Sequence, residues 1–77
     1  MSDAADTFIR LADVLKIRGV VATGGQAKAA IQAGGAKVNG EVEVRRGRKL
    51  RLGDKVEVGD VTITVDSDLL SRTSDED

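Results

Sequence analysis

The residues best suited to binding chemistry in this chain form one basic segment at positions 45–51. It contains Arg45, Arg46, Arg48, Lys49 and Arg51. Five positive charges within seven residues repel one another unless an anion neutralises them. Guanidinium groups match phosphate oxygens with paired hydrogen bonds, and an ammonium adds a compact charge. The segment is therefore a candidate phosphate contact, and a solvated basic loop is the alternative interpretation.

A second candidate anion site is the stretch Thr23-Gly24-Gly25-Gln26. Thr23 can accept a hydrogen bond from the amide of Gln26 while the Gln26 side chain reaches back, which is the pattern of an N-terminal capping box. The free amides of such a first turn carry the positive end of the helix dipole, and glycines let an anion approach closely. A helix start without any ligand is the alternative interpretation.

Charge is segregated along the chain, although the formal net charge is only -1. Residues 16–51 hold nine basic residues against two acidic ones, whereas residues 57–77 hold seven acidic residues against one arginine. Lys16, Lys28 and Lys37 belong to the basic part, and each taken singly could be an ordinary surface lysine. The basic part can attract polyanions even though the total charge is nearly zero.

The side chains that most enzymes and metal sites use are missing. The chain has no cysteine and no histidine, which excludes thiolate nucleophiles, histidine acid–base catalysis and the usual zinc ligands. No pair of carboxylates shows the spacing of a metal or acid–base site. We therefore expect no catalysis, no metal and no cofactor. No aromatic residue accompanies the basic segment, so recognition would depend on backbone charge and shape rather than base stacking.

Two helices are expected to position these candidate sites. Leu11, Val14 and Leu15 recur at helical spacing within residues 10–18, and Gly19 would end that helix. A second helix would begin at the Thr23 cap and end at the glycine pair 34–35. This arrangement places the glycine-rich opening directly after the loop between the helices.

The remainder of the chain predicts a sheet, because the apolar period changes to two and glycine turns follow at positions 39–40, 53–54 and 59–60. A two-residue turn at Gly59–Asp60 would pair Val56 with Ile63 and Val58 with Val61 on one buried face. If Asn39–Gly40 were a two-residue turn, each apolar residue before it would lie opposite a charged residue after it, and no single face could be buried. This conflict predicts a bulge or a wider loop.

These elements predict one domain of the α+β class, with two short helices packed on a small, mostly antiparallel sheet. With 77 residues and a single aromatic, the core is expected to be thin and aliphatic. We assign residues 1–6 to a disordered N-terminus, 7–66 to the domain and 67–77 to a disordered acidic tail. The sequence has no signal-like opening and no run of about 18 apolar residues, so we expect a cytoplasmic protein without membrane contact.

The order of these pieces resembles the RNA-binding domain named after ribosomal protein S-four. The resemblance covers about residues 8–58 and rests on Arg10-Leu11-x-x-x-Leu15-x-x-x-Gly19, Thr23-Gly24-Gly25-Gln26-Ala27-Lys28-x-x-Ile31, Gly34, Lys37-Val38-Asn39-Gly40 and Gly53-Asp54-x-Val56. With T-G-G-Q-A-K and R-R-G-R-K-L-R-x-G-D, the chain is most similar to the stand-alone YbcJ-like group of small bacterial proteins.

The resemblance implies a two-helix unit, the αL motif, that sets its helices and an adjoining β-loop against structured RNA. By that analogy the contact surface would include Arg10, Thr23, Gly24, Gln26, Lys28 and Lys37. Many family members have arginine where this chain has Gly24 and an acid where it has Ala12. Loss of that arginine would leave a larger share of the binding to Arg45, Arg46, Arg48 and Lys49.

We therefore expect a monomeric module for structured RNA, with ribosomal RNA, transfer RNA, and the ribosome or its precursors as candidate partners. One alternative is a protein-interaction module whose basic face docks an acidic protein. A further alternative is a ubiquitin-like sulfur carrier, because V-N-G-E followed by L-x-x-G-D-x-V resembles those proteins. Such carriers need a C-terminal Gly-Gly, and residues 73–77 contain no glycine.

Overall fold

The computed structural model describes residues 7–72 and has the α+β architecture expected from the sequence. Helices α1 (Leu11–Ile17) and α2 (Gly24–Gln32) are followed by a four-stranded antiparallel sheet in the order β3-β2-β5-β6. Its strands are β2 (Ala36–Val38), β3 (Glu41–Val42), β5 (Lys55–Val58) and β6 (Val61–Thr64). A separate antiparallel pair joins β1 (Ile9–Arg10) to β4 (Lys49–Leu50), and α3 (Ser67–Ser71) follows β6.

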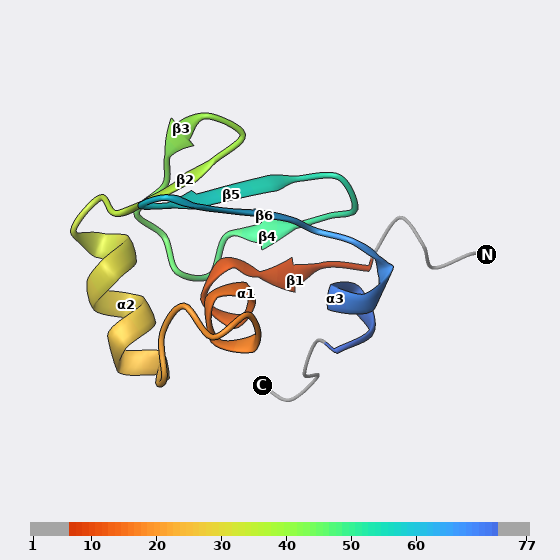
Figure 1. Ribbon diagram of the computed structural model, residues 1–77, viewed down its shortest axis with the longest axis horizontal. Coiled ribbons are helices and arrows are strands. Elements are labelled where there is room, and N and C mark those ends of the chain that lie inside the picture. Colours follow the sequence, from red (N-terminus) through yellow and green to blue (C-terminus); the bar gives the residue numbers. More distant parts are fainter. Residues whose placement is uncertain (1–6, 73–77) are drawn as a thin grey trace.

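The three helices lie on one side of the four-stranded sheet, with α2 and α3 at opposite ends of the molecule (Figure 1). Strand β1 leads directly into α1, and β4 follows the loop of residues 43–48. Within residues 7–72, no helix has the length and apolar character needed to cross a membrane.

The helix boundaries agree with the local signals in the sequence. After α1 the backbone of Gly19 adopts φ +75°, a left-handed conformation that costs glycine little. At the start of α2 the Thr23 hydroxyl oxygen accepts from the Gln26 amide at 3.1 Å, and Gln26 Oε1 accepts from the Ala22 amide at 2.7 Å. The predicted capping box is confirmed, with the reach-back bond made one residue earlier than in the standard pattern.

The two hairpins differ in how well they were predicted. Across Gly59–Asp60 the register pairs Val56 with Ile63, as expected, although Val61 at the end of the sheet is 45% exposed. Asn39–Gly40 forms a tight two-residue turn with both residues at positive φ, so the predicted bulge or wider loop is wrong. Apolar and charged residues can lie opposite each other across this turn, because β3 is a two-residue edge strand whose side chains are both exposed.

The core is aliphatic, as expected for a chain with one aromatic residue. Its buried members are Ile9, Leu11, Val14, Leu15, Ala27, Ile31, Ala36, Val38, Leu50, Val56, Ile63, Val65 and Leu69. Leu69 belongs to α3, whose amide at that position donates to the Asp66 side chain at 2.9 Å. The expected disordered tail is therefore corrected for residues 67–72, because an apolar side chain and an N-cap give this stretch a docked helical turn. Residues 1–6 and 73–77, which complete the predicted disordered ends, lie outside the described residues.

Candidate nucleic-acid interface

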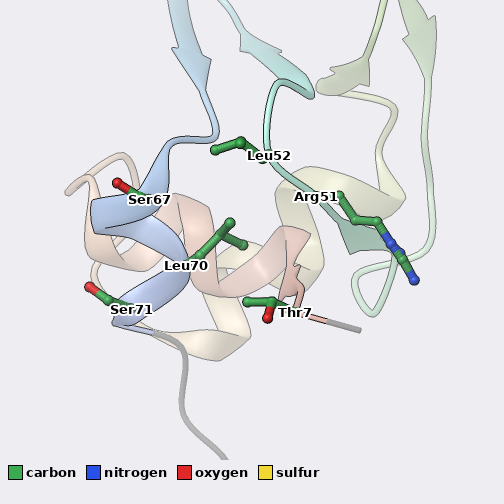
Figure 2. Close-up of a pocket in the computed structure, with 6 residues that line it drawn as sticks. All are labelled: Thr7, Arg51, Leu52, Ser67, Leu70 and Ser71. Atoms are coloured by element: carbon green, nitrogen blue, oxygen red, sulfur yellow. The ribbon is translucent and has the colours of Figure 1, made fainter. Parts of the chain in front are cut away.

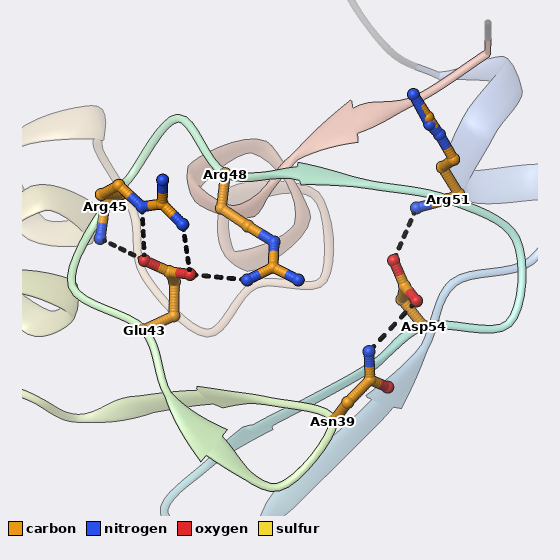
Figure 3. Close-up of polar contacts among 6 residues, drawn as sticks. All are labelled: Asn39, Glu43, Arg45, Arg48, Arg51 and Asp54. Carbon is orange, nitrogen blue, oxygen red and sulfur yellow. Dashed lines mark hydrogen bonds and ion pairs between the residues drawn. The ribbon is translucent and has the colours of Figure 1, made fainter.

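A buried carboxylate organises the first half of the basic segment. The Glu43 side chain is 8% exposed and accepts hydrogen bonds from Arg45 Nε at 3.0 Å and Arg48 Nη1 at 2.7 Å. The Arg45 amide also donates to Glu43 Oε2 at 3.0 Å. Figure 3 shows the two guanidinium groups approaching the carboxylate from different sides. One of the five charges in the segment is thus neutralised within the fold.

The same contacts set the protonation of Glu43. Hydrogen bonds from the Arg45 and Arg48 side chains, and then from the Arg45 amide, lower the pKa of Glu43 from 4.5 to about 2, against a smaller effect of burial. The carboxylate is therefore ionised throughout the physiological range. Arg45 remains 73% exposed despite this contact, so its outer side is still open to a ligand.

The basic loop, residues 43–48, is fixed against the first turn of α1 through its backbone. The Leu11 amide donates to the Arg48 carbonyl at 2.9 Å, and the Ala12 amide donates to the Arg46 carbonyl at 3.1 Å. These amides open α1 and have no acceptor inside the helix, so the loop carbonyls satisfy them. The Arg48 amide donates to the Arg45 carbonyl at 3.2 Å, which closes a turn within the loop.

This docking brings the basic loop beside the opening of α2. Arg10, Lys16, Gly24 and Arg46 line one surface pocket of about 340 Å³, together with Ala12, Asp13 and Gly47. Lys16 Nζ and Asp13 Oδ1 are 3.8 Å apart in a partly exposed ion pair, which contributes little to stability. Three cations, one carboxylate and the first residue of a helix therefore share one concave surface.

A second pocket of about 440 Å³ adjoins the first, since Gly47 lines both. Its other members are Arg45, Arg48 and Lys49. The two pockets together contain most of the basic residues named from the sequence. We call this combined surface the basic face, and define it by Arg10, Lys16, Gly24, Arg45, Arg46, Gly47, Arg48 and Lys49.

The first turn of α2 is open toward this surface. Gly24 and Gly25 are both exposed, and a Cβ added to Gly24 would meet no atom within 4 Å. The Thr23 hydroxyl and the Gln26 side-chain oxygen are both engaged in capping the helix. These two residues therefore contribute by shaping the helix start, while the glycine amides provide the positive end of the dipole.

Three of the basic residues predicted from the sequence line neither pocket of the basic face. Lys28 is exposed further along α2, and Lys37 is on the outer face of the sheet, paired across strands with Glu57. Arg51 lines an apolar pocket of about 430 Å³ that is formed with Leu52 and residues of α3 (Figure 2). Six of the nine basic residues predicted from the sequence thus line the two pockets, and these three do not.

Sequence reasoning overlooked several contacts made to the basic segment. Glu43 was visible as one of two acids in the basic part, yet its role depends on arginines two and five positions later folding around it. Asp54 accepts from the Arg51 amide at 2.9 Å and from Asn39 Nδ2 at 3.2 Å, which links the turn after β4 to the turn between β2 and β3 (Figure 3). Phe8 lies against Lys49, so an aromatic ring does accompany the basic segment in space.

The comparison with known protein families identifies a match over most of the chain. The family model described as S4 domain matches residues 3–66, which includes α1, α2, the basic loop and all six strands. A search of curated proteins finds no match.

Proposed function

The chain belongs to the S4 domain family, and from this we propose that it binds structured RNA at the basic face by phosphate charge and shape. Domains of this family are generally RNA-binding modules. The observation that carries the proposal is the pocket in which Arg10, Lys16 and Arg46 meet Gly24 at the opening of α2. These groups come from three separate segments and converge on one concavity.

The chemistry of the basic face suits a phosphate backbone. Arginine forks and a helix N-terminus are both established means of binding phosphate oxygens. Gly24 and Gly47 present no side chain, so a phosphate can approach the backbone at both positions. Because the two pockets adjoin, neighbouring phosphates of one strand can contact the face together.

The proposed ligand is folded or double-stranded RNA rather than a free single strand. Double-stranded RNA offers its phosphates and 2′-hydroxyls in a regular array, and it is recognised largely by shape. The chain has one aromatic residue, whereas single-strand binders stack successive bases on several. Ribosomal and transfer RNA, free or within the ribosome and its precursors, are the proposed targets of a monomeric, cytoplasmic, non-catalytic module.

The salt dependence of binding to a structured RNA tests this proposal. Neutralisation of about five phosphates should give a slope of about -4 in a plot of log affinity against log salt concentration. The same titration with a single-stranded RNA of equal length should give weaker binding. A flat slope, or no binding below about 100 µM at low salt, would contradict the proposal and favour an acidic protein as the partner.

A further inference from the structure

The one aromatic residue of the chain is placed outside the core. Phe8 is only partly buried and is absent from the cluster of buried aliphatic residues. An aromatic side chain offers more apolar area than any aliphatic one, so a chain with a single aromatic ring would gain most by burying it. Its position beside the basic face therefore indicates another use.

The register of β1 and β4 explains what surrounds the ring. Arg10 lies directly opposite Lys49, while Ile9 and Leu50 form the neighbouring pair and are buried. Side chains alternate between the faces of a strand, so Phe8, just before β1, falls on the same side as Arg10. Lys49 Nζ is 4.7 Å from the ring centroid of Phe8, and Arg10 Cζ is 5.5 Å from it.

Like charges directly opposite each other destabilise an antiparallel pair. Within residues 7–72, neither Arg10 nor Lys49 has a carboxylate partner. Both cations lie within the distance at which the negative face of an aromatic ring attracts them. The ring thus offsets the repulsion between two charges that would otherwise separate.

We propose that Phe8 is a positioning residue, which holds Arg10 and Lys49 side by side as a paired-cation site for an RNA phosphate. The ring differs from Glu43, which positions Arg45 and Arg48 but cancels one of their charges. An aromatic ring has no net charge, so both cations keep their full attraction for phosphate. This inference rests on the proposed RNA-binding function and adds a residue that touches no RNA itself.

A double-mutant cycle measures this coupling. Phe8→Leu keeps an apolar side chain but removes the aromatic face, and should weaken binding of a double-stranded RNA by about threefold to fivefold. Phe8→Tyr should restore near wild-type affinity. In a chain that carries both Arg10→Gln and Lys49→Gln, Phe8→Leu should have no further effect on binding. An equal loss in that background, or no loss in the wild-type background, would overturn the inference.

A nuclear magnetic resonance measurement on the free, wild-type protein tests the geometry without RNA and without relying on a variant that folds. Phe8 is the one source of an aromatic ring current in the chain. The side-chain ε-methylene protons of Lys49 should therefore resonate upfield of those of the exposed Lys55. Coinciding resonances would overturn the role of Phe8.

The two measurements separate the possible failures. A shifted Lys49 in a protein that binds no RNA would refute the proposed function and, with it, the phosphate role of the cation pair. RNA binding by a protein whose Lys49 is unshifted would refute the role of Phe8 alone.

Discussion

Replacing Arg46 by alanine removes a charge that no carboxylate neutralises among residues 7–72. Arg46 lines the pocket beside Gly24, and its bond to the fold is made by its carbonyl oxygen, which alanine retains. Each phosphate neutralised contributes about 0.9 to the salt slope, which at about 0.1 M salt corresponds to about 1.2 kcal/mol, or about eightfold in affinity. The stability change should stay within about 0.5 kcal/mol, because the side chain is exposed.

The assay is fluorescence anisotropy of a labelled RNA hairpin, recorded at several salt concentrations for both the wild-type protein and the Arg46→Ala variant. Lys55→Ala is the matched control, since it removes the same charge from an exposed position on β5 that lines neither pocket of the basic face. Arg46→Ala should reduce the slope by about one unit, and Lys55→Ala should leave it nearly unchanged. Equal effects of the two substitutions would refute the reasoning, because net charge rather than the assembled pocket would then govern binding.

Three further predictions concern the Glu43 ion pairs, the opening of α2 and the docking of α3. Since the pKa of Glu43 is lowered to about 2 from 4.5, its ion pairs stabilise the fold above about pH 4.5 and lose this effect as the pH falls through about 2. Urea denaturation should therefore find Glu43→Gln less stable than the wild-type protein at neutral pH, with the difference shrinking over that range; a difference independent of pH would contradict this. Gly24→Ala should melt at or above the wild-type temperature, because the added Cβ meets no atom within 4 Å, yet bind RNA more weakly; unchanged affinity would show that no phosphate approaches there. Leu69→Ala should cost about 2–4 kcal/mol in chemical denaturation, against about 0.5 kcal/mol or less for the 65% exposed Leu52→Ala; similar values would mean that α3 is not docked on the core.

The elements predicted well from the sequence are those whose signals are local. Gly19 and Gly34 adopt the positive φ values that end helices, and the cap at Thr23 uses hydrogen bonds within four residues of one another. The Gly59–Asp60 hairpin has the expected register because turn type and alternation agree there. Such features depend on a few neighbouring residues, all of which can be inspected in the sequence.

The errors arise where the position of an element in the folded domain decides the outcome. The pattern around Asn39–Gly40 would conflict with a tight turn only if one face of β3 had to be buried. Both residues of this edge strand are exposed, so neither face has to be apolar. Likewise, Leu69 was assigned to an acidic tail, because Leu69 and its single apolar neighbour Leu70 are too few to indicate a helix. Its burial depends on a core contributed by distant elements.

The sequence predicted most of the basic residues in the candidate site, but not which residues contact one another there. The sequence shows that residues 45–51 are basic. Only the folded loop shows that Glu43 binds two of the arginines, whereas Arg46 lines the open pocket. The contact of Phe8 with Lys49 depends on the pairing of β1 with β4, two short strands far apart in the chain. Long-range antiparallel pairing of two-residue strands leaves almost no periodic signal.

The central claim is that the basic loop and the opening of α2 act as one RNA-binding surface. A titration of isotopically labelled protein with a short RNA duplex, followed through backbone amide resonances, tests it most directly. The largest shifts should fall on Gly24, Gly25, Arg46 and Gly47, and should move together along the titration. Shifts confined to one of these two segments, or centred instead on Leu52 and α3, would contradict the claim.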